Sequence, residues 1–458
     1  VPDGTTVLQM LTLAGWVTEQ GSAGRTRIVR FLDGERTDRR AKLDEVVEPG
    51  DTIVVPEPYF NPSFSAAAGA PALSFVALRV GRLLTVTPSL PLTQVGIDSN
   101  VFNDSGERQT DFVVEARPEI GAELDFGRAL VEGYISAGLV YYRRFESERA
   151  VEPGYGSTIA LDLARRVTLT AGHAFQSSRQ RFTFELDPRV RRQVRDTYAE
   201  VELGPWGRVG FLVSAQASDQ GLPESATFAG EDLQRTLEQR DRRATAGVVF
   251  ELSPASSLTL SVSAASHRFP LFKERDADSS EFVAEVTFGS RSIVEGTAHV
   301  GLLRYGVFDP TAPDYLGPIF GGELWRPFAT RTEVGVRGSR GNGSSFQSSV
   351  VFAVYDQYGG WVRQGLTDRF DVVLRADRDE YNYQSFADSV VNDIRGERYT
   401  TEFGVLLGAH RVALQSTFEE RSGDSAYDGW RWGIVYSYGV FHAGTGQRPG
   451  TTQRPQRR

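Results

Sequence analysis

The chain of 458 residues contains no cysteine. Disulfide bonds, thiolate metal sites and thiol catalysis are therefore excluded, so packing and hydrogen bonds must hold the fold together. No run of 18 or more strongly apolar residues occurs either, and no transmembrane helix is expected. The nearest candidate, residues 61–78, is built from alanine, serine, proline and glycine and is predicted to be part of a linker. Because no basic, apolar signal segment stands at Val1, we expect a processed or truncated product.

The chain also has no excess of positive charge and only one methionine. The formal net charge is −9, whereas phosphate binding needs clustered positive charge, so a nucleic-acid partner is not expected. The single methionine contrasts with 47 glycines, 28 phenylalanines and 16 tyrosines. Aromatic residues pack well on pleated surfaces and glycines supply turns, so this composition favours β-structure.

From about residue 80 to residue 441, apolar and polar residues alternate in segments of roughly 9 to 15 residues, as they do in a strand with two unlike faces. In residues 112–124 the even positions are apolar and the odd ones mostly charged, and residues 368–377 repeat the pattern. The same alternation occurs in residues 197–203, 243–252, 281–288, 332–339, 401–407 and 412–421.

Short and long connections between these segments alternate along the chain. Residues 203–207, 253–255 and 289–290 read as short turns, whereas the polar stretches 178–192, 222–239, 304–315 and 384–398 read as long loops. Transmembrane barrels arrange periplasmic turns and extracellular loops in this way. Without helices, only a closed barrel can pair all of its backbone amides in lipid. We therefore predict a mainly β fold, an antiparallel up-and-down transmembrane β-barrel of about 18 strands, with 16 as the alternative.

Aromatic residues gather near the ends of the predicted strands, as the interfacial girdles of a membrane barrel require. The residues assigned to these girdles are Tyr141, Tyr142, Trp206, Trp325, Trp361, Trp430, Trp432, Tyr436 and Tyr438.

If the apolar positions face lipid, the charged positions surround an aqueous lumen. The predicted lumen-lining residues are Glu115, Arg117, Glu119, Glu123, Glu132, Glu200, Glu202, Glu285, Glu333, Arg337, Arg369, Asp371, Arg375, Asp377, Glu402 and Arg421. They could pair across strands and stiffen the wall. Alternatively, they could form a hydrated track on which sugar hydroxyls exchange hydrogen bonds.

Residues 1–58 have a different pattern, with a helical stretch at residues 7–14 and strands at residues 27–32 and 52–55. A turn containing Pro49, Gly50 and Asp51 precedes the second strand. The pattern predicts a small α+β domain at residues 1–58, a linker at residues 59–79, the barrel at residues 80–441, and a disordered basic tail at residues 442–458.

The motif Pro49-Gly50-Asp51-Thr52-Ile53-Val54-Val55-Pro56, preceded by Thr6-Val7-Leu8-Gln9 and Arg27-Ile28-Val29-Arg30, resembles the second half of a soluble-ligand-binding β-grasp (SLBB) domain of outer-membrane polysaccharide export proteins. In this chain Trp16 stands where a second glycine is common, and the opening strand of that domain is missing. The remainder is similar to the porin-like outer-membrane barrels of exopolysaccharide gene clusters, through residues 96–102, 110–112 and Arg117-Pro118.

These resemblances imply an outer-membrane conduit for exopolysaccharide or capsular polysaccharide, with the N-terminal domain in the periplasm. The implied partners are the polysaccharide, a periplasmic or inner-membrane copolymerase, and outer-membrane lipid. A structural anchor barrel with a blocked lumen and a general porin stay open as alternatives. The five histidines have no metal-ligand spacing, and neither a phosphate-binding loop nor a nucleophile elbow is present. We therefore expect no catalytic residue, cofactor or metal, and a surface enzyme that trims the polymer is the least favoured reading.

Overall fold

A computed structural model describes most of the chain from residue 27 onward. The described residues are 27–32, 35–40, 47, 52–54, 72–74, 78–81, 83–104, 106–181, 185–223, 226–253, 255–289, 292–328, 331–386, 391–407, 410–423 and 426–438. The predicted helix at residues 7–14, the motif Pro49, Gly50 and Asp51, and the predicted tail lie outside them.

Strands make up nearly all of the regular structure. They are β1 (Arg27–Leu32), β2 (Glu35–Arg40), β3 (Thr52–Val54), β4 (Ala72–Ser74), β5 (Leu78–Val80), β6 (Leu84–Asp98), β7 (Asp111–Ala116), β8 (Glu119–Asp125), β9 (Ala129–Tyr142), β10 (Ala150–Ala164), β11 (Val167–Gln180), β12 (Val190–Trp206), β13 (Val209–Gly221), β14 (Thr227–Phe228), β15 (Glu231–Asp232), β16 (Gln239–Ser253), β17 (Ser256–Arg268), β18 (Ala277–Phe288), β19 (Glu295–Val307), β20 (Tyr315–Pro327), β21 (Thr332–Gly343), β22 (Val350–Gly365), β23 (Phe370–Ser385), β24 (Ile394–Leu407), β25 (His410–Ser422) and β26 (Tyr427–Tyr438).

Within the described ranges, helical structure is confined to short turns. It consists of the α-helix α2 (Leu233–Leu237) and the 3-10 turns η2 (Glu146–Glu148) and η3 (Lys273–Arg275). Among the described residues, no helix is long and apolar enough to cross a membrane.

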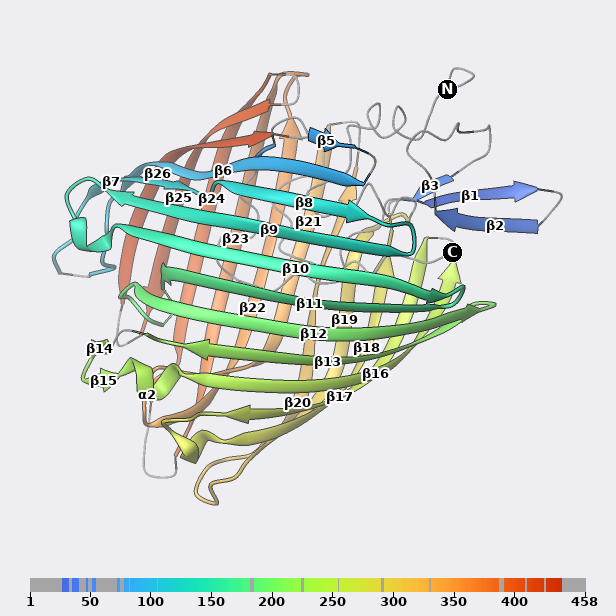
Figure 1. Ribbon diagram of the computed structural model, residues 1–458. Helices are drawn as coiled ribbons and strands as arrows, with labels where there is room; N and C mark the ends of the chain where they lie inside the picture. Colours follow the sequence, from blue (N-terminus) through green and yellow to red (C-terminus); the bar gives the residue numbers. More distant parts are fainter. Residues whose placement is uncertain are drawn as a thin grey trace.

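Strands β6 to β26, apart from the small β14–β15 hairpin, form one closed antiparallel barrel (Figure 1). The ring has 18 strand positions, because β7 and β8 share one position and β4 and β5 are short segments that pair with β6. The barrel closes where β26 pairs with β6, with Arg431 opposite Asp98. The fold and the prediction of about 18 strands are confirmed.

Two sequence expectations about this part of the ring were wrong. Residues 112–124, expected to form one strand, are divided into β7 and β8 at Arg117-Pro118, because proline has no amide hydrogen for the ladder. Residues 59–79, expected to be a linker, include β4 and the start of β5. These segments have little polar–apolar alternation, so no strand signal distinguished them.

The two faces of the wall differ as the alternation predicted. On β23, Phe370 and Leu374 are exposed, whereas Asp371 between them is almost completely buried. Large apolar side chains are exposed around the ring, among them Ile135 on β9, Phe282 on β18 and Val300 on β19. Such an outward apolar band is what lipid requires of a transmembrane barrel.

The girdle prediction holds only in part. Tyr141, Trp206, Trp430 and Trp432 are exposed, whereas Tyr142, Trp325 and Trp361 are 1%, 3% and 8% exposed. Trp361 lies against Gly335 on the neighbouring strand and donates a hydrogen bond from Nε1 to Glu323 Oε1 (3.1 Å). The strand register, which the sequence does not reveal, turns these three rings away from the lipid side.

The N-terminal strands form a separate three-stranded antiparallel sheet in the order β2-β1-β3. β1 and β3 coincide with the predicted strands at residues 27–32 and 52–55. β2 was not predicted, because its sequence Glu-Arg-Thr-Asp-Arg-Arg has no apolar alternation.

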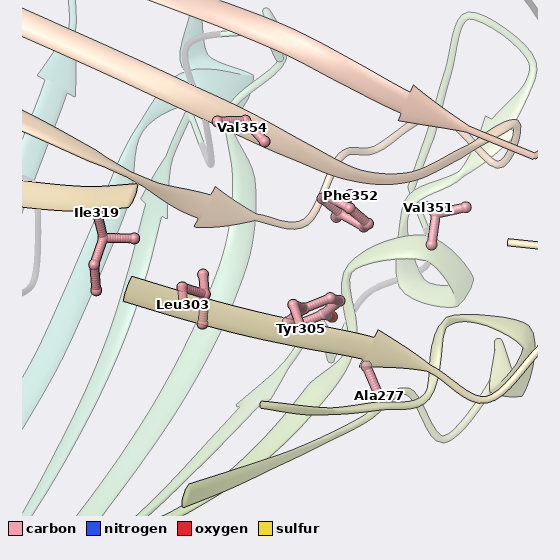
Figure 2. Close-up of a cluster of buried hydrophobic side chains, with 7 residues drawn as sticks. All are labelled: Ala277, Leu303, Tyr305, Ile319, Val351, Phe352 and Val354. Atoms are coloured by element: carbon pink, nitrogen blue, oxygen red, sulfur yellow. The ribbon is translucent and has the colours of Figure 1, made fainter. Parts of the chain in front are cut away.

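One end of the barrel has short turns and the other has long connections. The long connections include residues 99–110, 181–189, 222–238, 269–276 and 344–349, and β14, β15 and α2 lie within one of them. Near this end, β18, β19, β20 and β22 contribute a buried apolar cluster (Figure 2). Figure 2 labels its residues, Ala277, Leu303, Tyr305, Ile319, Val351, Phe352 and Val354.

Candidate functional site: the inner wall and the long-loop end of the barrel

Most of the predicted lumen-lining residues lie within the wall strands, on the face opposite the exposed apolar band. Arg117 lies between β7 and β8, and Arg369 departs from the expectation because it is exposed in the short turn between β22 and β23. Glu333, Asp371, Glu402 and Arg421 are almost completely buried. The half-buried members are Glu115, Arg117, Glu119, Glu123, Glu132, Glu200, Glu202, Glu285, Arg337, Arg375 and Asp377.

A buried ionic network joins four neighbouring strands, β22 to β25. Arg363 Nη2 lies 2.5 Å from Asp371 Oδ2, and Arg411 Nη2 lies 2.9 Å from Asp371 Oδ1. Arg411 Nη1 also lies 2.8 Å from Glu402 Oε2. Each charge is buried with an opposite partner. Removal of any one member would therefore leave an uncompensated charge in the wall and destabilise it.

Two further ion pairs include predicted residues. Arg337 lies 2.6 Å from Asp377, and Arg117 lies 3.0 Å from Glu152. This pairing favours the wall-stiffening interpretation for these positions. Arg363, Arg411 and Glu152 were not among the predicted residues, although the same alternation could have found them.

At the long-loop end, residue 181 and residues 185–189, the described part of one connection, contact both sides of the ring. They connect β11 to β12, yet Asp187 forms a 2.7 Å ion pair with Arg421 of β25 and Glu185 contacts Tyr383 of β23. In the strand order, β23 and β25 lie six to nine of the 18 strand positions away from β11 and β12. We call the described residues of this connection, residue 181 and residues 185–189, the crossing loop.

The crossing loop is also tied to the connection between β6 and β7. Arg181 Nη2 and Arg189 Nη1 both donate to the carbonyl oxygen of Val101, each at 2.9 Å. Val101 is fully buried. Burial and the neighbouring Arg189 lower the pKa of Arg181 to about 10.

Glu185 is the central buried charge of the crossing loop, with none of its surface exposed. Its Oε2 accepts hydrogen bonds from Ser345 Oγ (2.9 Å) and Tyr383 Oη (2.5 Å), and its Oε1 accepts from the amide of Phe346 (3.0 Å). Burial raises the pKa of Glu185 above its ordinary value, although these hydrogen bonds and the nearby Arg275 oppose the shift.

The connection 344–349, between β21 and β22, is held by two further loops. Arg275 donates to the carbonyl oxygens of Ser345 (2.7 Å) and Gln347, and also to that of Thr236 (2.9 Å). Glu231 accepts from the amide (3.1 Å) and hydroxyl (2.9 Å) of Ser348. Burial lowers the pKa of Arg275 to about 10.

An apolar cluster joins the crossing loop to the connections 222–238 and 344–349. Leu186 of the crossing loop packs with Leu233 and Leu237 of α2 and with Phe346, and all four are buried. Charged contacts and an apolar cluster thus hold four long connections together, and one of them contacts strands across the end of the barrel.

The sequence could not reveal these loop residues as a site. Residues 178–192 and 222–239 were predicted to be long polar loops, and surface loops ordinarily leave their charges in water. The burial of Glu185 and Arg275 depends on contacts between residues far apart in the chain, which no local periodicity records.

Comparison with known proteins agrees with this architecture. Residues 74–427 match the family described as Putative beta-barrel porin 2. The chain belongs to that family. The match spans the barrel from the end of β4 to the start of β26, so the protein is a porin-like barrel of the outer membrane. No curated protein sequence matches the chain.

Solved structures similar to this fold include two proteins of Pseudomonas aeruginosa and one siderophore receptor of Acinetobacter baumannii. OccK2 (OpdF) is 8% identical with a TM-score of 0.46, covering 78% of this chain and 98% of its own. OccK11 (OpdR) is 8% identical with a TM-score of 0.45, covering 78% and 96%. The siderophore receptor PirA of Acinetobacter baumannii is 8% identical with a TM-score of 0.41, covering 80% and 76%.

Proposed function

We propose that the protein is a gated outer-membrane conduit through which exopolysaccharide or capsular polysaccharide leaves the cell. The observation that supports this proposal is the closed barrel with a charged inner wall. The crossing loop contacts that wall at the long-loop end. A wall of paired charges offers many exchangeable hydrogen bonds and no single tight site, which suits passage of a hydroxyl-rich polymer. The crossing loop is held by a few specific contacts, so it can be displaced without unfolding the wall.

In this proposal the N-terminal domain, residues 1–58, faces the periplasm and docks the periplasmic or inner-membrane export machinery. Its support is the resemblance of residues 49–56 to the closing motif of export-protein β-grasp domains. The charged wall would serve as the polymer path, with Arg369 outside it.

A second candidate is a structural anchor barrel whose lumen stays blocked. The closed long-loop end favours it, because a barrel without transport has no need to open. A general porin is the third candidate, and it differs from the conduit in carrying small solutes without preference.

Planar bilayer conductance separates a conduit from an anchor. We expect the wild-type protein to conduct weakly and the double variant Glu185→Ala/Asp187→Ala to conduct several-fold more, because both contacts to the far wall are lost. The matched control is Glu146→Ala, which removes an exposed carboxylate in another long connection, paired only with Arg149 at 2.9 Å. A silent double variant that is folded would overturn the conduit and support the anchor.

Addition of soluble fragments of the cell's own polysaccharide then tests the cargo. A conduit for polymer should show current blockade by these fragments, and deletion of the gene should abolish surface polysaccharide. Open channels that ignore the fragments and pass small solutes would support a general porin. The non-enzymatic role stays a prediction, and an unchanged polymer length after incubation with purified protein is the expected result.

A further inference from the structure

The short turns of the barrel carry exposed arginines. They are Arg128 between β8 and β9, Arg165 and Arg166 between β10 and β11, Arg208 between β12 and β13, Arg326 at the end of β20, and Arg369 between β22 and β23. We call these six residues the arginine rim. Its excess of positive charge contrasts with the formal net charge of −9 for the whole chain.

The backbone of the rim is fixed although the side chains are exposed. The carbonyl oxygens of Arg128, Arg166 and Arg208 accept amide hydrogen bonds from the neighbouring strands, at 2.8 to 2.9 Å. That of Arg369 accepts from Leu406 at 2.7 Å. The guanidinium groups therefore project from set positions around the end of the barrel.

Carboxylates at this end are engaged with other groups. Asp125 accepts from the amide of Gly127, Asp162 accepts from the hydroxyl of Thr168, and Asp368 pairs with Arg331. Within the described part of the chain, no carboxylate forms an ion pair with any of the six rim arginines.

At the opposite end of the barrel, some arginines lie beside acids. Examples are Arg242 with Asp219 and Arg268 with Asp278, both at 2.8 Å. Arg378 likewise pairs with Glu380. At the short-turn end Arg331 pairs with Asp368 in the same way, whereas the six rim arginines have no such acid partner among the described residues.

Exposed apolar side chains stand beside the rim arginines. Phe126, Leu163, Trp206 and Leu366 each lie within three residues of one of them and are about half exposed, between 46% and 59%. Arg326 lies over the ring of Phe328, with its guanidinium carbon 5.3 Å from the ring centroid. Each cation therefore sits just beyond the apolar band, at the level where lipid headgroups begin.

We infer that the arginine rim binds the phosphate groups of anionic phospholipids in the leaflet at the short-turn end, which in barrels of this class is the periplasmic one. The guanidinium group matches phosphate oxygens with paired donors. Anionic lipid attracts such cations through its surface potential as well.

The distribution of the rim favours lipid over an acidic protein. Its turns fall into two arcs on opposite sides of the ring, between β8 and β13 and between β20 and β23. A leaflet surrounds the whole barrel and reaches both arcs, whereas a single docked protein would have to span the end of the barrel. The inference does not depend on polysaccharide export or on conductance.

Electron paramagnetic resonance of spin-labelled lipids tests the proposal on the full chain in bilayers. We expect the wild-type protein to associate with phosphatidylglycerol several-fold more strongly than with phosphatidylcholine, and this preference to weaken as ionic strength rises. The variant Arg165→Gln/Arg166→Gln/Arg208→Gln removes three of the six rim arginines and should lose about half of the preference. The matched control, Arg242→Gln/Arg268→Gln/Arg378→Gln at the long-loop end, should retain it.

Absence of a preference in the wild-type protein would overturn the inference, as would a preference that is undiminished in the folded rim variant. The wild-type salt titration keeps the test decisive if that variant does not fold. Salt-sensitive binding of a soluble polyglutamate peptide without any lipid preference would also overturn it, in favour of an acidic protein partner. A protein that is silent in conductance but selects phosphatidylglycerol would refute only the conduit.

Discussion

Tyr383 donates a hydrogen bond of 2.5 Å to Glu185, and this contact joins a strand of one wall to a loop that begins on the opposite wall. The two residues are 198 positions apart in the chain. Their contact, together with the ion pair between Asp187 and Arg421, holds the crossing loop over the barrel interior. Displacement of the crossing loop would therefore require the buried Glu185 carboxylate to lose its hydrogen-bond partners.

We expect channel opening to depend on pH through Glu185. Burial raises the pKa of Glu185, so its contribution to closure is fully present below the ordinary pKa of a carboxyl group and is lost as pH rises through the raised pKa. Open probability in planar bilayers should rise with pH over that window. Glu185→Gln, which cannot ionise, should flatten the dependence, whereas Glu146→Gln should leave it intact. The same pH profile in Glu185→Gln would refute a role of Glu185 in holding the crossing loop.

Asp371→Asn should destabilise the barrel strongly. The change leaves the buried Arg363 and Arg411 without their shared carboxylate, and breaking a buried pair costs about 3–5 kcal/mol. Urea unfolding in lipid vesicles, followed by tryptophan fluorescence, measures the loss. Asp368→Asn is the control, because its side chain is 88% exposed in its pair with Arg331 and should matter little. Equal effects of the two variants would contradict a structural role for the ionic network.

Gly335→Ala should disturb the packing of Trp361. A Cβ atom at Gly335 would lie 2.3 Å from the indole ring, so the ring must move and its hydrogen bond to Glu323 must break or shift. We expect a loss of about 1–3 kcal/mol in the free energy of unfolding, with a changed near-ultraviolet circular dichroism signal. At Gly360 an added Cβ would meet only the carbonyl oxygen of Gly335, at 3.5 Å, so Gly360→Ala should leave both measurements nearly unchanged.

Adjacent positions on β25 test which face contacts lipid. Leu414 is 55% exposed, whereas Gln415 donates to Glu402 at 3.2 Å. Leu414→Arg places a cation in the lipid and should cost about 2 kcal/mol in vesicles. Gln415→Arg places the cation beside Glu402 and should cost little. The reverse order of unfolding free energies would mean that the two faces have been assigned the wrong way round.

The sequence by itself determined the barrel. Alternation in residues 112–124 and 368–377, the lack of an apolar helix, and the order of short and long connections lead to a closed antiparallel ring, because each is a local property of the strand backbone in lipid. Alternation also separates Asp371 from Phe370 and Leu374, so most inner-wall charges could be predicted without coordinates.

Only the tertiary structure decided where Trp325, Trp361, Glu185 and Arg275 lie. The burial of the two tryptophans follows from strand register, and that of the two charges follows from loops that meet across the ring. Strand register and loop contacts produce no periodic pattern in the sequence, because the partners of these residues lie in segments remote in sequence. The strands of the wall therefore follow from local sequence pattern. The packing of the loops across the end of the barrel depends on contacts between segments that are distant in the sequence.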